Sequence, residues 1–116
     1  MKLNKRGEVG IKAEKSLAKR LNGSLTPASG AMPGAKGDIL VENFMIESKA
    51  TEKLSLSLKY EWLFKLAVQA MEENKVPALA LQFVGAHGSS LPRGSWIMVP
   101  EELFKRISNY AMESED

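Results

Sequence analysis

The chain has 116 residues, of which 44% are hydrophobic and 26% are charged, and it contains no cysteine. This length corresponds to one compact domain, and the apolar content is sufficient for a hydrophobic core, which excludes a disordered protein. The absence of cysteine excludes disulfides and thiolate metal sites, so that a bound metal ion would need oxygen ligands. We expect a single domain over residues 1–116 whose acidic end, at about 111–116, is frayed.

Neither a membrane span nor a secretory signal is recognisable in the sequence. The apolar runs are far shorter than a bilayer requires, and no apolar segment follows the basic N-terminus. These features predict a cytoplasmic protein with no membrane contact.

Positive charge is concentrated at the start of the chain. Residues 1–20 contain seven Lys or Arg against two Glu, whereas the net charge of the whole chain is only +2. A basic segment of this kind is typical of binding to a polyanion such as nucleic acid, but also of an ordinary solvated helix face. The charge pattern alone leaves both interpretations open.

Apolar spacing predicts a helix over about 7–21, with Ile11 and Leu17 among its core residues, and then a glycine- and proline-rich loop at 26–37 after a short strand at 24–26. Two strands follow at 38–41 and 44–51, joined by a tight turn, and then a largely buried helix over about 57–75. Two further strands are predicted at 78–84 and 96–99, separated by a loop at 85–94. Pro100 opens a last helix, in which Leu103, Phe104 and Ile107 are expected to face inward. The order α-β-β-β-α-β-β-α predicts a single α/β domain with a central mixed sheet flanked by helices.

Glu14 interrupts the apolar face of the first predicted helix. It lies one turn after Ile11 and one turn before Leu17. Such a carboxylate either reaches solvent at the edge of the apolar stripe or pairs with a cation or metal ion, since buried acids are rarely left unpaired.

Glu47 and Lys49 are side by side on one face of the strand at 44–51, because residues two apart in a strand point the same way. An isolated pair of this kind is usually a solvent-facing ion pair. Asp38, at the start of the neighbouring strand, favours another interpretation. Asp38, Glu47 and Glu14 would together form an all-oxygen site of the kind that Mg²⁺ prefers, with the Lys49 ammonium beside it. Such a site can hydrolyse a phosphodiester bond.

The residues that carry this pattern resemble the PD-(D/E)XK nuclease superfamily. Within it, the similarity is closest to the small archaeal-type and phage Holliday junction resolvases, over about residues 6–84. The matching positions are Glu14, Lys15, Leu17, Leu21, Ser29-Gly30, Gly37-Asp38-Ile39 and Ile46-Glu47-Ser48-Lys49. Gly37 stands where the family usually has proline, a residue that is not a ligand.

The resemblance implies a role for each matching polar residue. Asp38 and Glu47 correspond to the metal-binding acids, the carbonyl of Ser48 to a further ligand, and Lys49 to the catalytic lysine. Glu14 corresponds to the acid that the first helix contributes in the resolvases. Ser29 corresponds to a serine near the DNA backbone. The implied cofactor is Mg²⁺, with Mn²⁺ as a substitute.

These observations predict a Mg²⁺-dependent endonuclease that cleaves four-way DNA junctions in a prokaryotic cell or a phage-infected host. A nuclease of the same fold acting on other branched or duplex DNA is one alternative, and a non-catalytic DNA-binding module is another. The residues expected to contact DNA are Lys12, Lys15, Lys19, Ser29, Lys36 and Lys53.

We also expect a homodimer, because a four-way junction has two-fold symmetry and needs two nicks, whereas the chain has residues for one site. Trp62 falls on the polar side of the 57–75 helix, with Phe64 and Val68 nearby. Burial against a partner would explain an aromatic residue at that position. The C-terminal strand and helix are the alternative interface.

Overall fold

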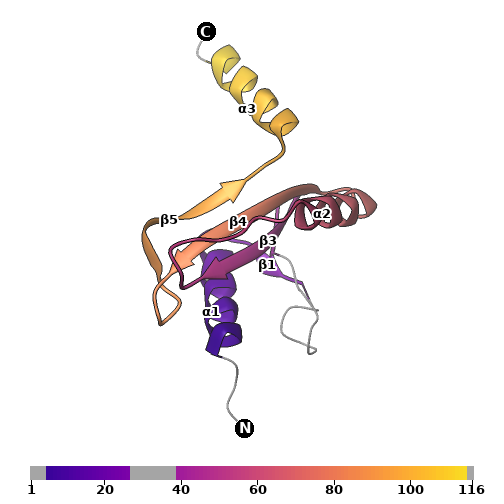
Figure 1. Cartoon of the computed structure of the whole chain (residues 1–116). Coiled ribbons are helices and arrows are strands. Elements are labelled where there is room, and N and C mark those ends of the chain that lie inside the picture. Colours follow the sequence, from indigo (N-terminus) through magenta and orange to yellow (C-terminus); the bar gives the residue numbers. More distant parts are fainter. Residues whose placement is uncertain (1–4, 27–38, 115–116) are drawn as a thin grey trace.

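The computed structural model describes residues 5–26 and 39–114, whose elements follow the predicted order (Figure 1). They are α1 (Lys5–Arg20), β1 (Ser24–Leu25), β2 (Ile39–Val41), β3 (Phe44–Thr51), α2 (Tyr60–Glu72), β4 (Val76–Val84), β5 (Ser90–Met98) and α3 (Glu101–Ser114). The predicted fold class, a single α/β domain with a mixed sheet, is confirmed. Among the helices of these residues, none combines the length and apolarity of a membrane span.

The five strands form one sheet in the order β1-β2-β3-β4-β5. β3 and β4 are parallel, and the other neighbours are antiparallel. The tight turn predicted at Glu42 and Asn43 joins β2 to β3, and Glu42 adopts a left-handed φ of 51° there. A parallel pair needs a connection that crosses from one end of the sheet to the other, and α2 provides it between β3 and β4.

The two faces of the sheet are covered by different helices. On one face, Ile46 of β3 and Ala80 of β4 pack with Leu17 of α1. On the other face, Met45 of β3 and Leu79 of β4 pack with residues of α2. Alternation along β3 therefore assigns odd-numbered residues to the α2 face and even-numbered residues to the α1 face, as predicted.

A buried glutamine connects α1 to the centre of the sheet. Gln82 of β4 is 1% exposed. Its Nε2 donates hydrogen bonds to the Ser48 hydroxyl of β3 at 2.9 Å and to the Ala13 carbonyl of α1 at 3.3 Å. Its Oε1 accepts a hydrogen bond from the Arg20 guanidinium at 3.1 Å. One side chain thus joins β3, β4 and both halves of α1.

Two helices are less buried than the sequence predicts. In α1, Leu17 is buried as predicted together with Ala18, but Ile11 is 45% exposed, and Val9 and Ala13 are buried in its place. In α2, only Leu66 and Ala70 are buried. The helix is also shorter than the predicted 57–75. Its apolar arc is wider than the one stripe that packs against β3 and β4, so the rest of the arc stays in solvent.

The C-terminal part of the chain departs further from expectation. β5 begins at Ser90, within the predicted loop. As an edge strand it tolerates Pro92. Arg93, with a left-handed φ of 55°, lies at a register shift of β5 against β4. The inward orientation predicted for α3 is wrong. Phe104 and Ile107 are 62% and 51% exposed, and α3 stands away from the sheet (Figure 1).

Replacing Gln82 by methionine tests whether its hydrogen bonds hold α1 on the sheet. Methionine has a similar volume but leaves the Ala13 carbonyl and the Ser48 hydroxyl without this donor. We expect the free energy of unfolding to fall by about 2 kcal/mol, the usual cost of an unsatisfied buried polar group. Urea denaturation measures it.

Ser95→Ala is the control. Its hydroxyl accepts a 3.4 Å hydrogen bond from Arg20 at an exposed position, so its loss should be nearly neutral. Equal stability of Gln82→Met and Ser95→Ala would contradict the role assigned to Gln82.

Candidate active site

β3 carries the central pair of the predicted site. Glu47 and Lys49 both point to the α2 face of the sheet, and the Lys49 ammonium lies 4.0 Å from Glu47 Oε2. The two side chains are 17% and 15% exposed, so the pair is not the solvent-facing ion pair that is common on strands. Such a half-buried pair experiences less screening by water than a surface pair, and its charges act more strongly on a bound ligand.

An aromatic ring covers the lysine of this pair. The Lys49 Nζ atom lies 4.2 Å from the centroid of the Trp62 ring of α2, and the Lys59 Nζ atom lies 5.9 Å from it. A cation over an indole ring is attracted by the negative face of the ring. Trp62 is half-buried, and its contact with Lys49 accounts for an aromatic residue on the polar side of α2 without a partner chain.

The pair lies next to the last partners of β2 and β3 that the structure describes. Within the described residues, the β2–β3 ladder ends at Ile39 opposite Ile46. Glu47 directly follows Ile46, and on its other side β3 pairs with β4 over its whole length. Asp38, which precedes Ile39 in the sequence, lies outside the described residues.

Glu14 lies in the other layer of the domain from Glu47. It is half-buried on α1, one turn before Ala18, which packs with Ile39 of β2. Glu14 therefore lies on the flank of α1 that faces β2, whereas Arg20 lies on the flank that faces β5. Glu47 projects from the opposite face of the sheet. The two carboxylates could meet only around the end of β2, and not across the sheet.

Ser48 has divided roles. Its side chain points to the α1 face, where the hydroxyl accepts a hydrogen bond from Gln82. The resemblance assigns the main-chain carbonyl of Ser48, and not this hydroxyl, to a metal ion.

The carboxylate and carbonyl oxygens of the predicted ligand set are of the type that a hard divalent ion prefers. In the part of the chain that the structure describes, no group of three His, Asp or Glu residues is close enough to hold a metal ion. The predicted ligand set includes Asp38, which lies outside that part. Glu47, the Ser48 carbonyl and Glu14 are the predicted ligands that the structure describes.

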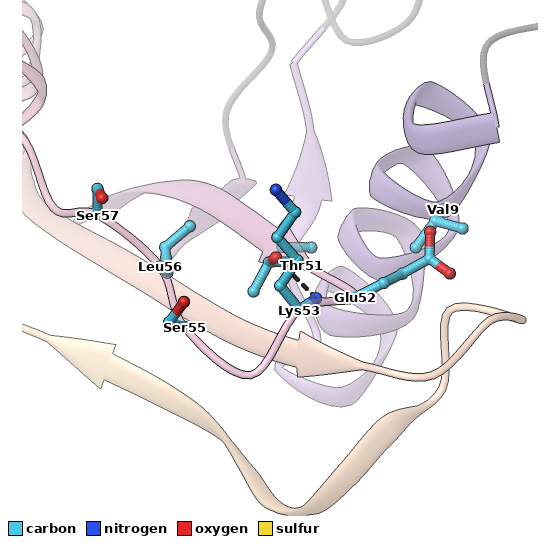
Figure 2. Close-up of a pocket in the computed structure, with 8 residues that line it drawn as sticks. Val9, Thr51, Glu52, Lys53, Ser55, Leu56 and Ser57 are labelled. Carbon is cyan, nitrogen blue, oxygen red and sulfur yellow. Dashed lines mark hydrogen bonds between the residues drawn. The ribbon is translucent and has the colours of Figure 1, made fainter.

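A polar cavity of about 570 Å³ lies at the end of β3, beyond Lys49. Figure 2 shows Val9 of α1 on one side of it and the segment Ser55–Ser57 on the other. Thr51 and Lys53 line the cavity between these two sides. The Lys53 amide donates a 3.0 Å hydrogen bond to the Thr51 hydroxyl. Hydroxyl groups and an ammonium group are typical partners of phosphate oxygens.

The predicted DNA contacts fall on two separate surfaces. Lys12, Lys15 and Lys19 are exposed and share the outer face of α1, which points away from the sheet. Lys53 lines the cavity at the end of β3, to which Val9 of α1 also contributes. The structure does not bring these two groups together. Ser29 and Lys36 lie outside the described residues.

Two contacts of the site could not be predicted from the spacing of residues in the sequence. Neither the contact of Trp62 with Lys49 nor the hydrogen bond of Gln82 to Ser48 follows from spacing, because each joins residues distant in the chain. The odd placement of both residues, an aromatic on a polar arc and a glutamine within an apolar strand, is the only indication.

Comparison with family models, with curated proteins and with solved structures finds no match for this chain. The likeness to a nuclease family therefore depends on the motif residues alone.

Trp62→Ala tests the contact between the indole ring and Lys49. Removal of the ring uncovers the Lys49 ammonium, so we expect this lysine to react several-fold faster with a water-soluble acylating reagent. Peptide mass spectrometry measures the modification of each lysine. Trp96→Ala, at the exposed tryptophan of β5, is the control and should leave the reactivity of Lys49 unchanged. If Trp62→Ala also left it unchanged, the ring would not shield this ammonium.

Proposed function

We propose that this protein is a Mg²⁺-dependent endonuclease that hydrolyses phosphodiester bonds in four-way DNA junctions. The observation that carries the proposal is the half-buried pair of Glu47 and Lys49 on β3, next to the Ile39–Ile46 partners of β2 and β3. The pair combines a metal-binding type of carboxylate with a shielded ammonium. Its position matches the motif through which the sequence resembles the junction resolvases.

In the proposed mechanism, Glu47, the Ser48 carbonyl, Asp38 and Glu14 would hold the ion. Bound Mg²⁺ would polarise a phosphoryl oxygen and lower the pKa of a water molecule. Lys49 donates hydrogen bonds to the attacking water and to the negative charge that develops as the new P–O bond forms and the bond to the leaving sugar oxygen breaks. Trp62 and Glu47 restrict the position of the Lys49 ammonium from two sides.

The cavity at the end of β3 is the proposed path of the DNA backbone next to the cleaved bond. It adjoins Lys49 along β3 and offers Lys53, Ser55 and Ser57 to phosphate oxygens. The outer face of α1, with Lys12, Lys15 and Lys19, is a second DNA-binding surface in this proposal. A branched DNA substrate has several duplex arms, and the two separate surfaces would bind different arms.

A non-catalytic DNA-binding module is the competing function. It is favoured by the separation of the α1 lysines from the Glu47–Lys49 pair, since phosphate binding by α1 needs no active site. Incubation of the purified protein with labelled four-way, forked and linear DNA, with and without Mg²⁺, separates these functions. The proposal predicts Mg²⁺-dependent cleavage of four-way DNA, whereas the module predicts binding without cleavage.

Glu47→Gln tests the metal-binding carboxylate. The substitution removes the charge but keeps the shape of the side chain, so we expect cleavage of four-way DNA to fall by about a hundredfold or more, while DNA binding persists. Asp38→Asn and Glu14→Gln should act in the same direction. Gel assays of cleavage and of binding give the two readouts.

Glu61→Gln is the matched control, because Glu61 is an exposed acid on α2 next to Trp62. It should cleave like the wild type. Cleavage by Glu47→Gln at the wild-type rate would place the active site elsewhere. Retained activity together with raised stability in Glu14→Leu would make Glu14 an ordinary surface acid.

Salt dependence tests which lysines contact DNA. Each phosphate contact that is lost lowers the slope of log K against log salt concentration by about 0.9. We therefore expect the triple variant Lys12→Ala, Lys15→Ala, Lys19→Ala to flatten the slope by roughly two to three units. Fluorescence anisotropy with labelled four-way DNA measures it.

The variant Lys53→Ala, Lys59→Ala is the comparison for the surface beside Lys49. Should only this second variant change the slope, DNA would bind on the cavity side alone. The α1 face would then be excluded as a DNA-binding surface.

A further inference from the structure

The helix α3 lacks the packing that holds the other two helices. α1 and α2 each make extensive contact with the sheet, whereas α3 has no comparable contact with any element of the described residues. Phe104 and Ile107 form an apolar stripe on α3, and both are more than half exposed. A helix of this length is marginally stable in water on its own. Its stripe therefore needs a surface to cover it.

The domain offers an apolar groove that no helix fills. The groove has a volume of about 220 Å³ and is lined mainly by Leu63, Leu66 and Ala67 of α2, Leu79 of β4, and Met98 and Pro100 at the end of β5. It lies on the face of the sheet that carries α2, at the side where β5 is left uncovered. On that same face Trp96 of β5 is 62% exposed. A helix lying beside α2 would cover this groove.

The link between β5 and α3 is too short for α3 to fold back easily onto the groove of its own domain. β5 ends at Met98 and α3 begins at Glu101, so two residues connect them. The Pro100 carbonyl already accepts hydrogen bonds from the amides of Leu103 and Phe104, which starts the helix directly at the link. Short links of this kind favour exchange of an element between copies over folding back.

We propose that the groove is occupied by α3 of a second copy of this chain. Each copy carries both halves of the contact, an apolar helix stripe and an apolar groove, so that a two-fold axis satisfies both at once. The exchanged helices would tie two domains together at a fixed separation. This inference goes beyond the proposed nuclease function and stands whether or not the protein cleaves DNA.

The first test places a charge in the stripe. Sedimentation equilibrium at micromolar concentration should give twice the chain mass of 12.8 kDa for the wild type. Ile107→Glu should halve this value to that of one chain. Asn109→Glu is the matched control, because it introduces the same charge on the opposite face of α3, and it should remain dimeric. Glu47→Gln should also remain dimeric, which separates this inference from the proposed function.

A monomeric wild type would overturn the inference. So would an Ile107→Glu variant that stays dimeric.

The second test distinguishes exchange from folding back. The chain has no cysteine, so a pair can be introduced as Ala67→Cys in the groove and Ile107→Cys on α3. After mild oxidation, exchange predicts a covalent dimer on a non-reducing gel. A disulfide within one chain would show that α3 returns to its own groove. A dimer without any disulfide would show that α3 lies elsewhere. Either result contradicts the proposal.

Discussion

The parallel pairing of β3 with β4 is the constraint on which the rest of the molecule depends. A parallel pair requires a crossing element, and this places α2 over the face of the sheet that carries Glu47 and Lys49. Trp62 then comes to lie over the Lys49 ammonium. The hydrogen bond from Gln82 to Ser48 joins the same two strands on the other face. A slip of β3 by one residue in this register would turn Glu47 and Lys49 towards α1 and take the Ser48 hydroxyl away from Gln82.

The same pairing explains how much of the fold is predictable from sequence. Alternation in β3 is a local property, and it correctly assigns Met45 and Ile46 to opposite faces. The amphipathic pattern of α3 is equally clear, but a pattern shows only that a helix has an apolar face. It does not show which surface covers that face. Phe104 is exposed for this reason, although the pattern predicts it to face inward.

The site is predictable only in part. Glu47 and Lys49 are adjacent on one strand, so their pairing follows from the geometry of a single element. The contact of Lys49 with Trp62 depends on where α2 crosses the sheet, which is a tertiary property. Likewise, the charge of the first segment predicts a basic helix face, but not that this outer face of α1 is turned away from Glu47.

The most direct test of a metal ion at Glu47 is paramagnetic broadening by Mn²⁺. A bound Mn²⁺ ion broadens the amide signals of nearby residues in a nuclear magnetic resonance spectrum of the ¹⁵N-labelled chain. Substoichiometric Mn²⁺ should erase the signals of Ile39 and of Ile46 to Lys49 first, while those of α3 persist, and excess Mg²⁺ should restore them. Broadening centred on another acidic region, or none at all, would contradict a metal site built on Glu47.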